Sequence, residues 1–191
     1  MIRTKTIGVL SLQGDFEAHR HAIEREGARA TEVRTPEQLA ECDALIIPGG
    51  ESTTMLKLLD IQKLTDPLKA FAAEKPVFGT CAGAILLAHL VTNPKQPSLG
   101  LLDIDVERNA YGRQIDSRIA QIETADGPTE AVFIRAPIIR RAGTEARVLA
   151  TYEKNPVWVQ QGRHMVTTFH PELSADSPVH RRFLLTVCEK P

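Results

Sequence analysis

The sequence predicts an α/β fold in three layers, in which helices flank a central, mostly parallel sheet. Two observations carry this prediction. Apolar, β-branched segments alternate with helical patterns through the first half of the chain, and such alternation is typical of right-handed crossovers between parallel strands. Residues 44–47 form a continuous apolar run that ends at Pro48-Gly49-Gly50, as expected for a strand that is buried on both faces.

The composition fits a single domain, residues 1–191, built around its own core. Of the 191 residues, 42% are hydrophobic and 25% are charged, which excludes disordered, collagen-like and coiled-coil chains. The 23 basic and 24 acidic residues nearly cancel, so charge gives no support for a nucleic-acid partner. The apolar run 82–91 is about half as long as a membrane span, and the N-terminus lacks a signal-peptide pattern. We therefore expect a cytoplasmic protein with no membrane partner.

The first elements follow from the hydrophobic pattern. Residues 5–12 are apolar and β-branched and are expected to form a strand. Residues 15–27 are expected to form a helix, because their apolar residues and His19 share one face and Gly27 can end it. A short second strand is expected at 31–34.

Helices and strands continue to alternate after the apolar run 44–47. Ser52 resembles the N-cap of a helix, and residues 66–74 form a second helical pattern with Pro67 in its first turn. Residues 76–79 are expected to form a strand, and the apolar residues 84–91 are expected to form a helix.

After Gly100 the pattern becomes richer in strands. Turn signals at 126–128 and 155–156 separate several β-like segments, and residues 178–188 are expected to form a final helix. The expected strands are 101–107, 115–122, 131–134, 148–152, 157–160 and 165–169.

Residues 79–83, Gly-Thr-Cys-Ala-Gly, have the pattern of a nucleophile elbow with cysteine in place of serine. Small residues on either side permit a sharp turn that exposes Cys81 at the edge of the sheet. The N-terminus of the following helix favours a thiolate there, and the N–H of Ala82 can point at a developing oxyanion. Cys42 and Cys188 lack this context. Three cysteines without close spacing suit neither a disulfide framework nor a metal site.

A cysteine nucleophile needs a base, and the base needs a group that orients it. His170 follows the expected strand 165–169, and Glu172 lies two residues later. Residues i and i+2 of an extended segment face the same side, so Glu172 can fix the tautomer of His170. The other five histidines lack this combination and are expected to face solvent or to be packed; they are His19, His21, His89, His164 and His180.

Six segments in order resemble the class I, or triad, glutamine amidotransferases, and among them the glutaminase subunits of pyridoxal 5′-phosphate synthases. The elbow 79–83 and Thr-Phe-His-Pro-Glu-Leu at 168–173 are common to triad glutaminases. The other four are Leu-Gln-Gly at 12–14, Pro-Gly-Gly-Glu-Ser-Thr at 48–53, Arg-Asn-Ala-Tyr-Gly-Arg-Gln at 108–114 and Phe-Ile-Arg-Ala-Pro at 133–137. The resemblance spans nearly the whole chain and implies the fold of this family.

The resemblance also implies catalytic roles. Cys81 would attack the side-chain amide of L-glutamine, His170 would take the thiol proton and then protonate the departing ammonia, and Glu172 would orient His170. Water would then hydrolyse the thioester to L-glutamate. No cofactor and no metal are implied.

The resemblance further implies which residues bind glutamine: Gly50, Glu51, Ser52, Arg108, Ile134 and Arg135. Gly50 and Ala82 would supply the oxyanion N–H groups. A guanidinium suits the substrate α-carboxylate, but the residues alone do not distinguish Arg108 from Arg113. Gln13, at the exit of the first strand, would lie near the oxyanion region and the partner interface, or would be a plain turn residue.

The implied partner is the lyase subunit of pyridoxal 5′-phosphate synthase, in a large hetero-oligomer through which ammonia is channelled. Two alternatives remain. The chain could serve a different amidotransferase, in the histidine, anthranilate or GMP pathway, or it could be a non-catalytic α/β binding domain. The segments 108–114 and 133–137 disfavour the former, and the presence of all three triad candidates disfavours the latter.

Overall fold

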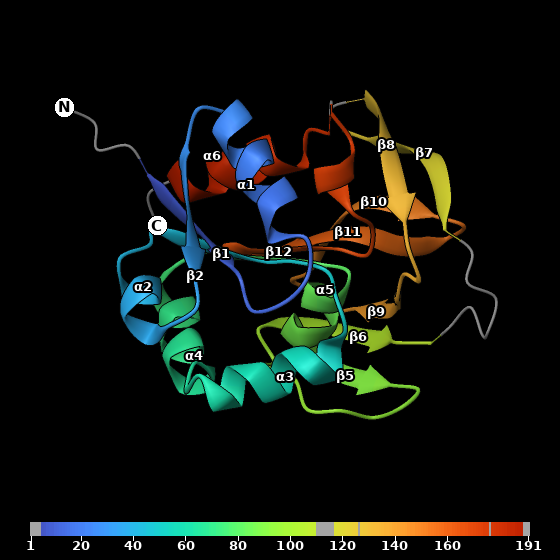
Figure 1. The fold of residues 1–191 in the computed structure, drawn as a ribbon. Helices are drawn as coiled ribbons and strands as arrows, with labels where there is room; N and C mark the ends of the chain where they lie inside the picture. The colour runs from blue at the N-terminus through green and yellow to red at the C-terminus, as the bar shows by residue number, and fades with distance from the viewer. Residues whose placement is uncertain (1–4, 110–116, 126, 176, 189–191) are drawn as a thin grey trace.

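The computed structural model describes residues 5–109, 117–125, 127–175 and 177–188 (Figure 1). The elements in these ranges, in chain order, are β1 (Thr6–Leu10), α1 (Phe16–Arg25), β2 (Arg29–Val33), α2 (Pro36–Ala40), β3 (Ala44–Ile47), α3 (Ser52–Ile61), α4 (Thr65–Glu74), β4 (Val77–Thr80), α5 (Ala82–Leu87), β5 (Ala88–Thr92), β6 (Leu102–Glu107), β7 (Arg118–Thr124), β8 (Gly127–Phe133), β9 (Ile138–Ala142), β10 (Arg147–Tyr152), β11 (Asn155–Gln161), β12 (His164–Thr167), the 3-10 helix η1 (Pro171–Leu173) and α6 (Val179–Cys188).

A seven-stranded sheet forms the centre of the fold, in the order β10-β11-β12-β4-β3-β1-β2. The pairs among β12, β4, β3, β1 and β2 are all parallel, and β10 and β11 add an antiparallel edge. The mostly parallel sheet that the sequence predicts is therefore confirmed. Its parallel arrangement brings the carboxyl ends of β1, β3, β4 and β12 to one edge.

Helices cover both faces of this sheet, with α1 and α6 on one face and α2 to α5 on the other (Figure 1). The side chains of β3 show why both faces must be covered. Ala44 and Ile46 pack in a cluster with residues of α1 and α6, whereas Leu45 and Ile47 pack in a second cluster with residues of α3, α4 and α5. All four side chains are fully buried. The prediction of a strand buried on both faces is thus confirmed, and the three layers follow from it.

Two smaller sheets complete the described part of the chain. One has the order β5-β6-β9, and the other is the antiparallel hairpin β7-β8. Among the described segments, every helix is too short or too polar to cross a lipid bilayer.

Three of our local predictions are wrong. Residues 84–91 do not form one helix, because α5 ends at Leu87 and the chain continues as β5, which pairs with β6. Ser52 is the first residue of α3, and Glu51 is its N-cap. The turn expected at 155–156 occurs at Glu153-Lys154, where both residues have positive φ, and β11 begins at Asn155.

Some elements also begin or end away from their expected positions. The elements α2 and β9 were not predicted, and β8 begins four residues earlier than expected, at Gly127. The strand expected at 115–122 occurs as β7, at Arg118–Thr124, and the first part of its expected range lies outside the described residues.

Candidate active site

Cys81 stands in the turn between β4 and α5. Its backbone has φ 49° and ψ −102°, a combination that costs a non-glycine residue energy. The N–H of Cys81 donates to the carbonyl of Thr167 over 2.8 Å, which ties the turn to β12. Only 6% of the residue is exposed. The predicted sharp turn after a buried strand is therefore present.

The glycines on either side of Cys81 are required by close backbone contacts. A β-carbon on Gly79 would lie 2.6 Å from the backbone of Gly83, and one on Gly83 would overlap the carbonyl of Ile47. These glycines allow α5 to begin directly against β3 and β4.

His170 and Glu172 come from the segment that follows β12. The N–H of His170 donates to the carbonyl of Val132 over 2.8 Å, which anchors this segment to β8. Nδ1 of the His170 ring lies 2.7 Å from Oε1 of Glu172. Because Glu172 is 6% exposed and ionised, this contact favours a proton on Nδ1 and leaves Nε2 free for chemistry.

The environment shifts the pKa values of both groups. Burial acts to lower the pKa of His170, but hydrogen-bonding contacts with Cys81 and Glu172 outweigh it and raise that pKa to about 10. Burial acts to raise the pKa of Glu172, but its interactions with His19 and His170 outweigh it and hold that pKa below the ordinary value. The site therefore stabilises His170 in the protonated form that it reaches when it takes a proton, next to an ionised Glu172 carboxylate.

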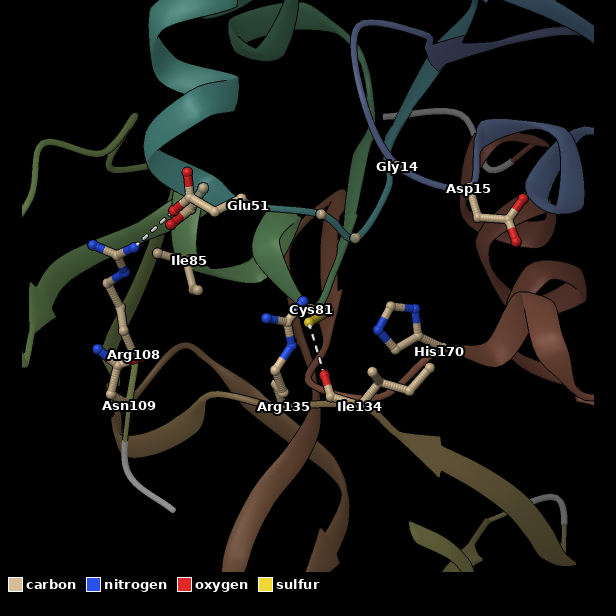
Figure 2. Close-up of a pocket in the computed structure, with 13 residues that line it drawn as sticks. Gly14, Asp15, Glu51, Cys81, Ile85, Arg108, Asn109, Ile134, Arg135 and His170 are labelled. Carbon is tan, nitrogen blue, oxygen red and sulfur yellow. Dashed lines mark hydrogen bonds and ion pairs between the residues drawn. The ribbon is translucent and has the colours of Figure 1, made fainter. Parts of the chain in front are cut away.

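A pocket of about 330 Å³ opens over Cys81 and His170 (Figure 2). Its volume lies at the small end of the range for small-molecule sites, which is about 300–1,000 Å³. The sulfur of Cys81 lies 3.8 Å from the carbonyl oxygen of Ile134. The lining residues are Gly14, Asp15, Gly49, Gly50, Glu51, Ser52, Cys81, Ile85, Arg108, Asn109, Ile134, Arg135 and His170.

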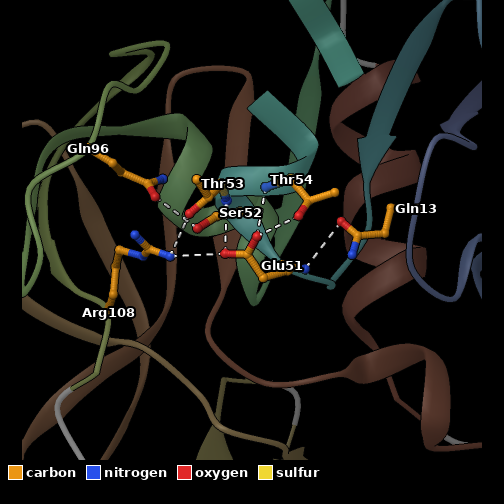
Figure 3. Close-up of polar contacts among 7 residues, drawn as sticks. All are labelled: Gln13, Glu51, Ser52, Thr53, Thr54, Gln96 and Arg108. Atoms are coloured by element: carbon orange, nitrogen blue, oxygen red, sulfur yellow. Dashed lines mark hydrogen bonds and ion pairs between the residues drawn. The ribbon is translucent and has the colours of Figure 1, made fainter. Parts of the chain in front are cut away.

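Glu51 organises the side of the pocket that faces α3 (Figure 3). Its carboxylate accepts hydrogen bonds from the N–H groups of Thr53, at 3.0 Å, and Thr54, at 2.7 Å. Nη2 of Arg108 donates to Glu51 Oε1 and to Thr53 Oγ1, each over 3.1 Å. Burial acts to raise the pKa of Glu51, but the bonds from Thr54 and Thr53 outweigh it and lower that pKa to about 2.

Gln13 and Ser52 fix the loop that joins β3 to α3. The N–H of Glu51 donates to Oε1 of Gln13 over 3.3 Å, and a β-carbon on Gly50 would lie 3.3 Å from the same oxygen. Ser52 is 2% exposed, and its hydroxyl donates to Oε1 of Gln96 over 3.1 Å. Gln13 and Arg108 thus contact the Glu51 segment from opposite sides (Figure 3).

Most residues singled out from the sequence meet at this pocket. Eight of them line it: Gly50, Glu51, Ser52, Cys81, Arg108, Ile134, Arg135 and His170. Glu172 lies behind His170, Ala82 begins α5, and Gln13 contacts Glu51 without lining the pocket. Arg113 lies outside the described residues.

Five lining residues were missed as site residues: Gly14, Asp15, Gly49, Ile85 and Asn109. Three of them, Gly14, Gly49 and Asn109, are chain neighbours of residues that were named, and Asp15 is two residues beyond Gln13. Ile85 is one turn of helix beyond Cys81, and helical spacing was the signal that could have found it.

The other cysteines have different surroundings. Cys42 is buried, and burial outweighs the attraction of Lys75 and raises the pKa of its thiol to about 11. Cys188 is exposed near the end of α6. Neither lines the pocket around Cys81.

The chain is similar to glutamine amidotransferases and to subunits of pyridoxal 5′-phosphate synthase. Residues 9–190 match the SNO glutamine amidotransferase family. The chain is 60% identical over 188 residues to the pyridoxal 5′-phosphate synthase subunit PdxT of Solibacter usitatus, a match that covers 94% of this chain and 98% of that one. It is 54% identical over 183 residues to the same subunit of Koribacter versatilis, covering 95% of each. It is also similar to a crystal structure of a glutamine amidotransferase, with a TM-score of 0.90 and 45% identity over 96% of this chain and 99% of that one.

Proposed function

The chain belongs to the SNO glutamine amidotransferase family, and from that premise we propose that it hydrolyses L-glutamine to L-glutamate and ammonia as the glutaminase subunit of a pyridoxal 5′-phosphate synthase. The observation that carries the proposal is the arrangement of three side chains at one pocket. Cys81 and His170 both line it, and Nδ1 of His170 lies 2.7 Å from the buried carboxylate of Glu172. Cys81 is placed to act as the nucleophile, His170 as its base and Glu172 as the acid that orients the base.

In the proposed reaction, the sulfur of Cys81 forms a bond to the side-chain amide carbon of glutamine. His170 takes the thiol proton and gives a proton to the amide nitrogen, so that ammonia leaves and a thioester remains. Water then attacks the thioester with His170 as the base, which releases glutamate and restores the thiol. The raised pKa of His170 supports its role as the proton donor to the leaving nitrogen.

Two backbone N–H groups would stabilise the oxyanion that forms in each step. Ala82 is the first residue of α5, so its N–H has no partner within the helix. Gly50 lines the pocket on the opposite loop and would supply the second donor. A donor pre-positioned in this way typically contributes about 3–4 kcal/mol to catalysis.

We assign the binding of glutamine to Gly50, Glu51, Ser52, Arg108, Ile134 and Arg135. The side chain of Arg108 is 14% exposed and contacts the pocket wall through Glu51 and Thr53. Its guanidinium would bind the α-carboxylate of the substrate, because a planar fork of donors matches two carboxylate oxygens.

Gln13 is the proposed link between the pocket and the partner subunit. Its side chain accepts a bond from the N–H of Glu51 and packs against Gly50, so a shift of Gln13 on docking would reorient the Gly50 peptide. We infer low activity for the isolated chain and activation by the lyase subunit.

The partner would be that lyase subunit, in a large hetero-oligomer. Ammonia is protonated and lost in bulk water, so its delivery requires a route from the pocket to the synthase. We further propose that residues 1–191 form one glutaminase domain and that it works in the cytoplasm, where reducing conditions keep a catalytic thiol such as Cys81 free.

The test is release of glutamate from glutamine, with and without the lyase subunit of a pyridoxal 5′-phosphate synthase. We expect release that the lyase subunit stimulates, and none from Cys81→Ala, with Cys42→Ala as the matched control that retains activity. A glutamine analogue carrying an electrophile should label Cys81 in the complex. Undiminished glutamate release by Cys81→Ala would refute the assignment.

Neither alternative is favoured. A glutaminase for the histidine, anthranilate or GMP pathway would be stimulated by the synthase of that pathway, and the two relatives above are instead pyridoxal 5′-phosphate synthase subunits. A non-catalytic binding domain would have no need of the three triad side chains.

A further inference from the structure

Two buried histidines lie directly behind Glu172, on the side away from the pocket. His19 of α1 is fully buried, and His180 of α6 is 2% exposed. Nε2 of His19 lies 3.4 Å from Oε2 of Glu172 and 3.2 Å from Oγ1 of Thr80. Nδ1 of His19 lies 2.9 Å from Nε2 of His180. The proposed reaction uses neither histidine.

The second oxygen of Glu172 needs a donor. Oε1 is bonded to His170, but Oε2 is buried and has no hydrogen bond that meets strict geometry within the described part of the chain. A buried carboxylate oxygen without a donor costs about 1–3 kcal/mol or more. The ring nitrogen of His19 at 3.4 Å is placed to supply that donor with a small adjustment.

The charge of Glu172 selects the tautomer of His19. A neutral imidazole has one N–H and one lone pair. A lone pair on Nε2 would face the Glu172 carboxylate, which is unfavourable in a dry environment, so the proton belongs on Nε2. Nδ1 is then an acceptor, and His180 donates to it from its own Nε2.

Burial keeps both histidines neutral. It lowers the pKa of His19, against the attraction of Glu172, and it lowers the pKa of His180 to about 3, with added repulsion from His19. With this tautomer His180 donates to His19, and the Nε2–H of His19 lies within reach of two oxygens, Oγ1 of Thr80 and Oε2 of Glu172. His170 donates to the same carboxylate from the other side.

We propose that His19 is a positioning residue, whose Nε2–H donates to Oε2 of Glu172 and thereby fixes the carboxylate that orients His170. The inference rests on the proposed glutaminase function, because Glu172 is the orienting acid of that reaction. His180 completes the arrangement by holding the other nitrogen of His19.

Two substitutions separate this role from simple packing. The amide of His19→Gln reaches the position of Nε2 and can still donate to Glu172. The amide of His19→Asn is shorter and can reach only the position of Nδ1. Both variants replace the ring by a neutral amide, so each is the matched control of the other.

The measurement is glutamate release by the complex with the lyase subunit. We expect His19→Asn to lower kcat by about ten- to a hundredfold, the effect of one hydrogen bond to a charged group, with little change in KM. His19→Gln should stay within about threefold of the wild type. In a Glu172→Gln background, where the carboxylate is absent, His19→Asn should have little further effect.

Equal activities for the Asn and Gln variants would overturn the proposal. It would also be overturned if the loss of kcat in the double variant, His19→Asn with Glu172→Gln, equalled the product of the losses in the two single variants. ¹⁵N NMR of the imidazoles in the wild type provides a test that does not depend on how the variants fold: it should find His19 protonated on Nε2, and protonation on Nδ1 alone would overturn the proposal. An inactive wild-type complex would instead overturn the proposed function.

Discussion

The imidazole of His170 lies against the bare backbone of Gly49. A β-carbon on Gly49 would overlap Cε1 of the ring and lie 3.2 Å and 3.3 Å from its two nitrogens. The ring nitrogen next to Cε1, Nδ1, is held by Glu172. Gly49 therefore sets how closely the loop after β3 can approach the proposed base, and the loop in turn limits where the ring can lie.

We predict that Gly49→Ala lowers kcat/KM for glutamine about 100-fold, because an added methyl group must displace His170, and a displacement of about 1 Å can cost that much. Steady-state glutamate release by the complex measures the effect. Gly162→Ala is the control: its β-carbon meets nothing within 4 Å, but its φ of 55° makes alanine strained. That variant should lose stability and keep its kcat/KM. Equal activities of the two variants would contradict the prediction.

Cys81 stores backbone strain that glycine would relieve. With φ 49° and ψ −102°, a non-glycine residue costs about 1–3 kcal/mol at this position, whereas glycine adds about 0.5–1 kcal/mol of chain entropy. We predict that Cys81→Gly unfolds at a higher urea concentration than Cys81→Ala, although both lack the nucleophile. Equilibrium unfolding of the two variants measures the difference, and a less stable glycine variant would show that the turn is unstrained.

The buried strands and the elbow could be predicted because their causes are local. The run 44–47 is apolar at every position, which suits a strand covered on both faces, and Gly79 and Gly83 mark the backbone contacts around Cys81. His170 and Glu172 are two residues apart, so their contact also needs little knowledge of the fold.

The missed features depend on contacts between distant segments. Residues 88–92 continue an apolar run that favours a helix, but pairing with β6 makes them a strand. His19 lies on the apolar face of α1, where a packed histidine is the ordinary expectation. Its neighbours Thr80, Glu172 and His180 are 61 to 161 residues away, and only the folded chain brings them together.

Arg108 should control the affinity for glutamine. Loss of its charged hydrogen bonds in Arg108→Ala should raise KM about ten- to a hundredfold and change kcat less. Arg141→Ala is the matched control, because Arg141 pairs with Asp103 and Asp105 at the surface and does not line the pocket. Substrate saturation curves for the complex measure both values. An unchanged KM in Arg108→Ala would remove this residue from the substrate site.

The carboxylate of Glu51 should make α3 sensitive to acid. The pKa of Glu51 is about 2 in the folded chain, against an ordinary value of 4.5. A carboxyl group with a depressed folded pKa contributes stability that is fully present above the unfolded value and is lost as pH falls through the folded value. The contribution should therefore fade between about pH 4.5 and about pH 2.

Glu51→Gln isolates this contribution, because the amide can still accept a bond at the N-cap but does not titrate. The Glu51 side chain is half exposed, and solvent screening limits the advantage of the charge to about 1 kcal/mol. We predict that the wild type is more stable than the variant by about that amount near pH 6, and that the difference approaches zero near pH 2. Other carboxylates titrate in both proteins and cancel in the comparison. Urea unfolding across this pH range measures the difference in unfolding free energy between the two proteins. A difference that stays constant with pH would mean that the Glu51 charge contributes nothing to the cap.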